Sequence, residues 1–139
     1  MTLIVQKFGG TSVGNLDRIN HVADKIIQAK KQGHQIVVVS SAMNGETDKL
    51  IQLGMSICDE PNSREHDMLV STGEQAAVAL IAIALISKGC PARSYTGAQA
   101  GIKTDGVHKK ARIIGISPDV LQTDLALNIV PVVAGFQGV

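Results

Sequence analysis

The sequence predicts an α/β fold: a mainly parallel sheet with helices on both faces, incomplete at its C-terminal end. Short runs rich in β-branched residues alternate with segments of helical period, which is the pattern of βαβ units. The chain of 139 residues can bury one core without disulfide or metal support. In addition, the final apolar run stops where a strand would lead into another helix. One domain, residues 1–139, is therefore expected.

The first forty residues predict a strand, a helix and a second strand. Residues 3–7 and 35–39 are short apolar runs rich in valine and isoleucine, as buried strands are. Between them, apolar residues recur every three or four positions, which predicts a helix at residues 15–31 with one side on the sheet. Gly33 follows as its stop signal.

Two further helices are expected in the middle of the chain. One should begin near Thr47 and turn its apolar residues inward, at Leu50, Ile51, Leu53 and Ile57. The other covers residues 73–88 and is apolar nearly all round, so it should be buried.

The last third of the chain predicts two strands, at residues 92–95 and 129–134, with a short helix between them. Ser117 should cap this helix, with Pro118 as its first residue and its end near Leu127. No repeat or low-complexity linker separates these elements.

The end of the sequence, IVPVVAGFQGV, reaches the point where a strand hands over to a loop. Doubly wound sheets usually continue from such a point into another helix, so the fold is expected to be incomplete at this end. Pro131 has no N–H to donate, so this strand should lie at an edge of the sheet or leave that position unpaired.

Composition excludes several classes of protein. Thirteen Lys and Arg against twelve Asp and Glu give a net charge of +1, so nucleic acid is not an expected partner. Cys58, Cys90 and four scattered histidines form neither a disulfide framework nor a zinc pattern. The longest apolar run, residues 76–86, is shorter than the about 20 residues of a bilayer span, and the N-terminal residues do not show the pattern of a signal peptide. We therefore expect a cytoplasmic protein with no membrane partner.

The loop after the first strand combines a lysine with two glycines, in the stretch LIVQKFGGTSVGN. Gly9 and Gly10 allow close approach by a ligand, the following residues open a helix whose free N–H groups attract an anion, and Lys7 adds a positive charge. Neither a Walker A loop nor the dinucleotide fingerprint matches, the latter because Thr11 stands where its second glycine belongs. From the residues alone, a phosphate cradle and an ordinary glycine-rich turn with a solvated lysine are both acceptable interpretations.

Two further segments carry polar groups suited to ligand binding. In SSAMNGETD, which leaves the second strand, Ser41, Asn44 and Thr47 offer small hydrogen-bonding groups. In STGEQ, Glu74 is expected at the start of the apolar helix. Glu74 either complements the dipole of that helix or pairs with the ammonium group of a ligand, and both interpretations stay open.

Other polar residues are better explained by structure than by function. Arg64, Glu65 and Asp67 fit a charged helix start on a solvated face. Residues 94–108 predict a loop excursion in which Gln99 and Thr104 have structural roles. His108, in the same excursion, is not part of a recognisable charge-pair or metal-ligand pattern in the sequence, which favours a surface or packing histidine.

A resemblance to a known family rests on a set of motifs taken together. The segments VQKFGGTS, VVVSSAMNGETD, REHDMLVSTGEQ, SYTGAQAGI and VVAGFQGV stand in the order, and close to the spacing, seen in aspartate kinases. Along the whole chain the sequence is therefore similar to this branch of the amino acid kinase family. The resemblance implies a phosphotransferase with a carboxyl acceptor: ATP with Mg²⁺ phosphorylates the β-carboxylate of L-aspartate, the first step towards lysine, threonine and methionine.

The resemblance also implies roles for individual residues. Phosphate binding is implied for Lys7, Phe8, Gly9 and Gly10, with Lys7 also acting on the transferring phosphoryl group. Contacts with the amino acid are implied for Ser41, Ala42, Thr47, Glu74, Gly135 and Phe136, in which Glu74 would meet the substrate ammonium group. No residue is implied as a metal ligand.

Members of this family continue past the position of Val139, into a second half with more of the nucleotide site. Residues 1–139 are therefore expected to be the N-terminal, amino-acid-binding part of an amino acid kinase domain, inactive when isolated and a homo-oligomer when full length. Two alternatives stay open. The chain could belong to another amino acid kinase, or it could be a non-catalytic module for ligand sensing or assembly.

Overall fold

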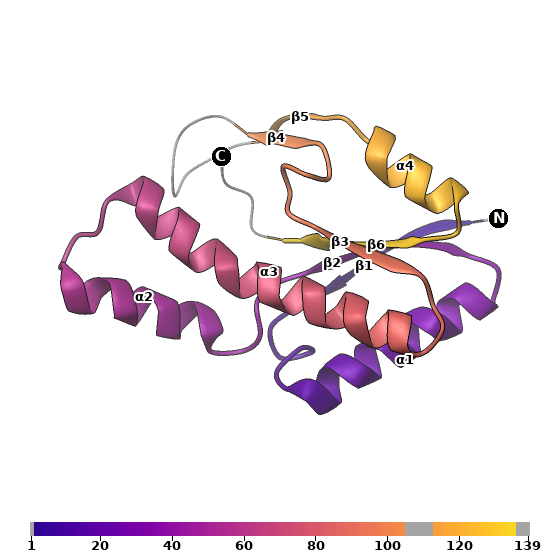
Figure 1. Cartoon of the computed structure of the whole chain (residues 1–139), viewed down its shortest axis with the longest axis horizontal. Coiled ribbons are helices and arrows are strands. Elements are labelled where there is room, and N and C mark those ends of the chain that lie inside the picture. The colour runs from indigo at the N-terminus through magenta and orange to yellow at the C-terminus, as the bar shows by residue number, and fades with distance from the viewer. Residues whose placement is uncertain (1, 105–112, 136–139) are drawn as a thin grey trace.

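The computed structural model describes residues 2–104 and 113–135, which form a mainly parallel sheet with helices on both faces (Figure 1). The predicted fold class is thus confirmed, and each strand predicted from the sequence is present within one residue of its expected bounds. The elements follow in the order β1 (Leu3–Phe8), α1 (Leu16–Lys31), β2 (Gln35–Ser40), α2 (Glu46–Ile57), α3 (Ser63–Ser87), β3 (Ala92–Tyr95), β4 (Ile102–Thr104), β5 (Ile113–Ile116), α4 (Asp119–Ala126) and β6 (Val130–Ala134).

The main sheet is parallel throughout, in the order β1-β2-β6-β3. Phe8 of β1 lies opposite Ser40 of β2, and Ser40 lies opposite Ala134 of β6, so the carboxyl ends of these strands reach one edge of the sheet. Because β6 is an interior strand, the second of the two alternatives predicted for Pro131 holds: its N–H position is left unpaired, and the residue does not lie at an edge of the sheet. The ladder between β6 and β2 begins only at Val132, so the missing N–H of the proline breaks no bond there.

The two faces of the sheet belong to different cores. Ile36 and Val38 of β2 pack with α1 and α3, whereas Val37, between them, packs on the other face with Leu121 and Leu125 of α4. This alternation follows from the period of two of a β-strand. Continuous apolar runs such as β2 therefore reflect a strand that is covered on both faces.

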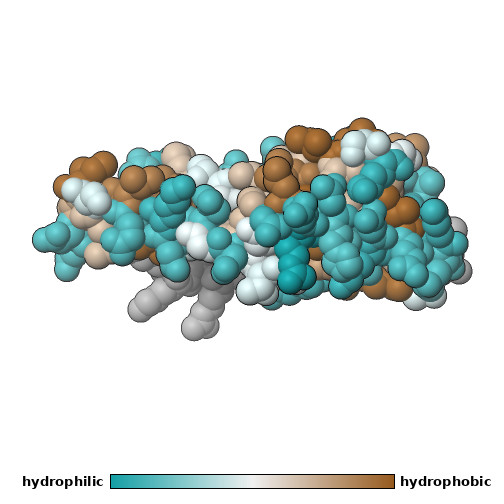
Figure 2. Space-filling model, turned by 90° about the horizontal axis from the view of Figure 1, so that it is seen from below, coloured by the Kyte–Doolittle hydropathy of each residue, from teal (hydrophilic) through white to brown (hydrophobic). Residues whose placement is uncertain are grey.

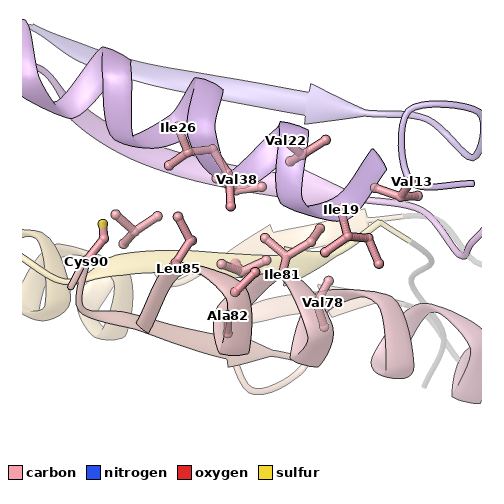
Figure 3. Close-up of a cluster of buried hydrophobic side chains, with 14 of the residues drawn as sticks. Val13, Ile19, Val22, Ile26, Val38, Val78, Ile81, Ala82, Leu85 and Cys90 are labelled. Carbon is pink, nitrogen blue, oxygen red and sulfur yellow. The ribbon is translucent and has the colours of Figure 1, made fainter. Parts of the chain in front are cut away.

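Helices α1 and α3 meet over the larger core. Figure 3 shows Ile19, Val22 and Ile26 of α1 facing Ile81 and Leu85 of α3, and all five side chains are buried. The spacing of three and four residues on α1 places these side chains on one side of the helix. Burying each such side chain stabilises the fold by about 1.5–3 kcal/mol, so a truncation such as Ile81→Ala should cost about 2–5 kcal/mol.

Helix α3 begins ten residues earlier than predicted, at Ser63 instead of Gly73. The side chain of Asn62 accepts hydrogen bonds from the backbone N–H groups of Arg64 and Glu65 and so caps the helix. The predicted bounds of 73–88 followed the apolar residues alone, although Arg64, Glu65 and Asp67 of this polar first half had been interpreted as a charged helix start. Ile83 is 62% exposed and Ile86 is 56% exposed, so the expectation that this helix is buried all round is also wrong.

Helix α3 is the one helix in the described ranges that is long and apolar enough to cross a membrane. Within that apolar segment, 44% is buried in the protein, and the helix packs against β3, β6 and α1. The core helix of a globular domain meets the same criteria of length and composition, and the packing of α3 fits that description.

Helix α2 begins at Glu46, next to the predicted Thr47, and Leu50 and Ile51 are half-buried, but the inward position expected for Leu53 and Ile57 is wrong. Leu53 is 56% exposed and Ile57 is 91% exposed, because α2 packs against α3 and lies beyond the edge of the sheet. Figure 2 shows apolar surface at the end of the molecule where α2 and the start of α3 lie.

The predicted loop excursion contains strand β4, which pairs antiparallel with β5, at residues 113–116, and neither strand was predicted from the sequence. Ser117 does not cap α4 as predicted, because the N-cap residue is Pro118 and no side chain caps the helix. The backbone N–H of Ser117 instead donates to the carbonyl oxygen of Gly101, at 2.8 Å. A Cβ atom at Gly101 would lie 1.9 Å from the Ser117 carbonyl oxygen, so only glycine fits this contact. His108 lies outside the described residues.

A buried carboxylate attaches α4 to the sheet. Asp124 is 1% exposed and accepts a hydrogen bond from the hydroxyl group of Tyr95 on β3. Its other oxygen accepts from the guanidinium group of Arg93, at 3.0 Å, in an ion pair. Paired charges with several hydrogen bonds are the form in which carboxylates are tolerated inside proteins. This cluster holds α4 over the face of the sheet opposite α1.

Candidate functional site

Three chain segments meet at the carboxyl edge of the sheet, where open α/β folds bind ligands. The backbone N–H of Ser41 donates to the carbonyl oxygen of Phe8, at 3.2 Å, which ties the end of β2 to the end of β1. The N–H of Gly135 donates to the carbonyl oxygen of Ser40, at 2.8 Å, which ties in the end of β6. The structure therefore brings together segments that lie far apart in the sequence.

Lys7 lies near the end of β1, opposite Val39 of β2. Its neighbours on the same strand, Ile4 and Phe8, pack against the α1 core, so the alternation of the strand places Lys7 on the opposite face. The side chain is exposed and forms no ion pair with any described residue. Lys7 is thus an uncompensated cation beside the edge where the loops gather, while Phe8 has a packing role.

The two glycines that follow β1 differ in what surrounds them, and only Gly10 lies close to a neighbouring segment of the chain. Neither Gly9 nor Gly10 has the positive φ angle that four other glycines of the described chain adopt. A Cβ atom at Gly10 would lie 3.3 Å from the carbonyl oxygen of Ala42, whereas a Cβ at Gly9 would meet nothing within 4 Å. Gly10 therefore fits the chain against the next loop, and Gly9 leaves open space in front of the backbone.

The anion site expected at this loop is not the N-terminus of α1. The helix begins only at Leu16, and the side chain of Asn15 caps it by accepting from the N–H of Arg18 at 2.9 Å. The loop itself turns through hydrogen bonds from Ser12 to Gly9 (3.1 Å) and from Val13 to Gly10 (3.3 Å). In the described part of the chain, the N–H groups of residues 9–11 donate no backbone hydrogen bond, so they remain available to phosphate oxygens.

Residues 41–45, which we call the β2–α2 loop, lead into the second helix. Gly45 is the N-cap of α2, with φ at 84°, a left-handed angle that favours glycine, and no side chain caps the helix. Thr47 stands in the first turn and is exposed. Uncapped N–H groups at a helix N-terminus favour a negatively charged ligand group, such as a carboxylate.

The structure places Glu74 in the interior of α3, so its predicted position at a helix start is wrong. The interpretation of Glu74 as a partner of the helix dipole falls with it, because that effect is confined to the first turn. The preceding residue, Gly73, is buried against the β2–α2 loop: a Cβ atom there would lie 3.3 Å from the Cβ of Ala42. Glu74, half-buried, therefore stands beside this loop.

Ser41 and Ala42 lie in the β2–α2 loop, at the carboxyl end of β2. Ala42 is 5% exposed and Ser41 is half-buried, with its hydroxyl group donating to the carbonyl oxygen of Ala42 at 3.4 Å. Ser40 and Gly73 lie in the predicted segments SSAMNGETD and STGEQ, but neither was singled out as a site residue. The available signals were a serine at the end of a buried strand and a lone glycine in a helical segment.

The remaining predicted residues divide between surface and interior. Arg64 and Glu65 form an ion pair at 3.1 Å with both side chains 61% exposed, as a solvated helix start requires. Asp67 is 6% exposed, so its predicted solvated position is wrong. Gln99 accepts from the N–H of Thr96 at 2.9 Å and thus has the expected structural role.

Two predicted residues are described only in part or not at all. The side chain of Thr104 and the whole of Phe136 lie outside what the structure describes. Gly135, next to Phe136, is exposed, and a Cβ atom there would lie 3.3 Å from the Ser40 carbonyl oxygen.

The donor set fits phosphate better than it fits a metal ion. Lys7 and the free N–H groups of residues 9–11 are suited to phosphate oxygens. Among the described residues, no group of three or more His, Cys, Asp or Glu side chains is placed to hold a metal ion.

Burial raises the pKa of the Cys90 thiol, which keeps this cysteine protonated and unreactive.

The fold is an open α/β domain whose loops gather at the carboxyl ends of parallel strands, the edge at which such folds bind ligands. A sequence profile described as the amino acid kinase family matches residues 2–139. The chain belongs to the amino acid kinase family.

Curated relatives and solved structures agree with this assignment. The chain is 55% identical over 139 residues to an aspartate kinase of Pseudomonas putida, covering all of this chain and 34% of that protein. It is 51% identical over 138 residues to aspartokinase 2 of Bacillus subtilis, covering 99% of this chain and again 34% of that protein. The chain thus spans about a third of the length of the curated relatives it matches.

The crystal structure of an aspartate kinase from Synechocystis superposes on the whole chain with a TM-score of 0.84, at 47% identity, and the match covers 22% of that chain. Aspartokinase III of E. coli, solved with aspartate and ADP, matches with a TM-score of 0.79 over 99% of this chain and 41% of its own. At 20% identity, this second likeness shows the fold alone.

Proposed function

We propose that this chain is the amino-acid-binding part of an aspartate kinase, which transfers the terminal phosphate of ATP to the β-carboxylate of L-aspartate. The observation that carries the proposal is the convergence of Lys7, residues 9–11 and the β2–α2 loop on one edge of the sheet. The relatives of 50–55% identity, all named aspartate kinase or aspartokinase, support the choice of substrate.

In the proposed reaction, a β-carboxylate oxygen attacks the terminal phosphorus of ATP, the new P–O bond forms as the bond to the bridging oxygen breaks, and ADP leaves. Lys7 compensates the negative charge on the phosphoryl oxygens, and the N–H groups beside Gly9 and Gly10 hold the phosphates, with Phe8 supporting the strand below. Mg²⁺ would supply further charge neutralisation when bound. The described residues provide no ligand set for it, so we derive no step through the metal.

The amino acid would lie between α3 and the β2–α2 loop. Glu74 would pair with its ammonium group, and the uncapped first turn of α2 at Thr47 would accept a carboxylate. Ser41 and Ala42 would line this pocket, with Gly135 and Phe136 closing it from the end of β6. One acidic side chain opposite a set of N–H donors is the arrangement that an amino acid requires.

The proposal extends to the whole protein in which these residues act. We propose a cytoplasmic homo-oligomeric enzyme of lysine, threonine and methionine biosynthesis, without nucleic-acid or membrane partners. Relatives are longer, so we expect groups beyond residues 1–139 to complete the nucleotide site. The chain alone should therefore bind aspartate weakly and transfer phosphate negligibly, because losing one transition-state donor already costs about 10²–10³ in rate.

A graft tests the function directly. Residues 1–139 replace the aligned segment of the Pseudomonas putida aspartate kinase, and ADP release and trapping of the acyl phosphate by hydroxylamine are measured with aspartate and with glutamate. We expect aspartate-dependent turnover. A folded graft that prefers glutamate would identify another amino acid kinase instead. A graft that is inactive, while the isolated chain gains thermal stability with aspartate but not with ATP, would indicate a sensing module.

A further inference from the structure

Glu74 and Thr47, which we propose contact the bound amino acid, belong to different helices. Glu74 is in the interior of α3, and Thr47 is in the first turn of α2. The distance between them therefore depends on how closely α2 and the β2–α2 loop rest on α3. Gly73, the residue before Glu74, lies in close contact with both the β2–α2 loop and α2.

We infer that Gly73 is a positioning residue for the proposed reaction: its missing side chain lets Ala42 and the first turns of α2 lie directly on α3, and so fixes Thr47 relative to Glu74. The inference rests on the proposed function. Gly73 itself touches neither substrate nor phosphate in this proposal, and acts through the loop and helix that it supports.

The contacts around Gly73 are too close to accept a methyl group without a shift of the neighbouring atoms. A Cβ atom there would lie 3.3 Å from the Cβ of Ala42 and 3.3 Å from Cδ1 of Leu50, with the Cβ of Glu46 at 3.9 Å. Carbon atoms are normally about 3.5–4.0 Å apart at their optimal separation, so both neighbours would have to move. Gly73 is not among the described glycines with positive φ, so backbone conformation does not require glycine at this position.

Ala42 has little freedom to yield. It is 5% exposed, and on its other side its carbonyl oxygen would lie 3.3 Å from a Cβ atom at Gly10. The neighbouring Asn44 is held to Gly10 by a backbone hydrogen bond of 3.1 Å. Because this loop is confined between Gly10 and Gly73, an added methyl group should push α2 and its first turn away from Glu74.

A glycine inside a helix also needs an explanation of its own. Gly73 is the one glycine of α3, in a segment where alanine would stabilise the helix. Gly73→Ala should therefore increase the helix propensity of α3 while it disturbs the proposed site. Because the two effects have opposite directions, the effect on folding can be told apart from the effect on catalysis.

The test uses the graft described above, carrying Gly73→Ala, Ala42→Gly or both. We expect Gly73→Ala to raise the KM for aspartate and lower kcat, each by about 3- to 10-fold, because small misplacements of reacting groups cost large factors in rate. The KM for ATP should change less than about twofold, and the melting temperature should fall by no more than a few degrees. Adding Ala42→Gly removes one of the two groups that the new methyl group would contact too closely. The decrease in log(kcat/KM) of the double variant, relative to the parent graft, should be at most half of the decrease in Gly73→Ala.

Gly54→Ala is the matched control, because Gly54 is also a helical glycine but a Cβ there would lie at an ordinary 3.5 Å from Leu69. It should leave kcat and both KM values unchanged. The inference is overturned if Gly73→Ala matches the parent graft in kinetics, or if kcat/KM falls only in proportion to lost folded protein and Ala42→Gly does not rescue it. A parent graft that makes no acyl phosphate removes the proposed function, and this inference with it.

Discussion

Asn44 donates its backbone N–H to the carbonyl oxygen of Gly10, at 3.1 Å, across the gap between the loops that leave β1 and β2. The first of these loops carries the proposed phosphate site, and the second carries the proposed amino acid site. A direct backbone bond between them means that neither loop can shift alone. Substitutions that separate the loops should therefore affect both stability and catalysis.

Gly10→Ala should reduce the free energy of unfolding by about 1–3 kcal/mol, the usual cost of overpacking. The new Cβ would lie 3.3 Å from the Ala42 carbonyl oxygen and 3.5 Å from Cα of Asn44, and both are backbone atoms that cannot rotate away. Gly9→Ala is the stability control, because its Cβ would meet nothing within 4 Å. Urea denaturation of the two variants measures the difference, and equal losses would contradict the close approach at Gly10.

Lys7→Met should lower kcat of the grafted enzyme by about 10²–10³, because it removes the positive charge that we propose acts on the phosphoryl group while keeping a side chain of similar length. The free energy of unfolding should stay within about 0.5 kcal/mol of the parent value, since Lys7 is exposed and unpaired within the described residues. Lys25→Met, an exposed lysine of α1, is the control and should keep full activity. Full activity of Lys7→Met would remove Lys7 from the mechanism.

Glu74→Gln should raise the KM for aspartate by about 10- to 100-fold, because a hydrogen bond to a charged group contributes about 1.5–3 kcal/mol. The amide keeps the size of the carboxylate but cannot neutralise an ammonium group. The KM for ATP should not change. Glu65→Gln on the same helix, where the carboxylate pairs with Arg64 at the surface, should alter neither constant. An unchanged KM for aspartate in Glu74→Gln would place the ammonium group elsewhere.

The elements that were predicted correctly are those whose own residues indicate their structure, without reference to distant parts of the chain. Strands such as Gln35–Ser40 are short runs of β-branched residues, and their composition alone indicates a buried strand. The order of the segments then placed Lys7, Ser41 and Gly135 at strand ends, and parallel pairing brings such ends to one edge. These parts of the candidate site could be predicted because strand topology determines them.

Most of the errors have a common cause: the contact that determines the structure is made with residues far away in the sequence. Leu53 and Ile57 have the spacing of a buried face, but α2 lies beyond the sheet and has only α3 to cover it. The pairing of β4 with β5 depends on a partner strand that composition does not reveal. The start of α3 is the exception, since Asn62 offered a local capping signal that apolar periodicity outweighed in the prediction.

Gly73 illustrates the same limit within the site. A glycine in a helical segment predicts either a helix end or a close contact, and the sequence analysis took the region as a helix start. Only the packing of Ala42 and Leu50 against α3 distinguishes the two.

The hydrogen bond between Tyr95 and Asp124 predicts how stability depends on pH. Burial raises the pKa of the Tyr95 hydroxyl group above its ordinary value of about 10, and the hydrogen bond to Asp124 raises it further. The folded protein therefore holds this proton more tightly than the unfolded chain does. The resulting stability is fully present below about pH 10 and is lost as the pH rises through the higher pKa of the folded state.

Tyr95→Phe tests this relationship. At pH 7 it should cost about 1–2 kcal/mol, because Asp124 loses a buried hydrogen-bond donor and keeps only Arg93. Above about pH 10, the free energy of unfolding of the variant should fall less steeply with pH than that of the parent. The difference between the two curves isolates Tyr95, because every other ionisable group is common to both proteins. Tyr95 is the only tyrosine of the chain, so the ultraviolet absorbance of its phenolate reports its ionisation directly in the folded protein. A folded-state pKa at or below the ordinary value, or parallel stability curves for the two proteins, would show that the hydroxyl group is not held by Asp124 as the structure places it.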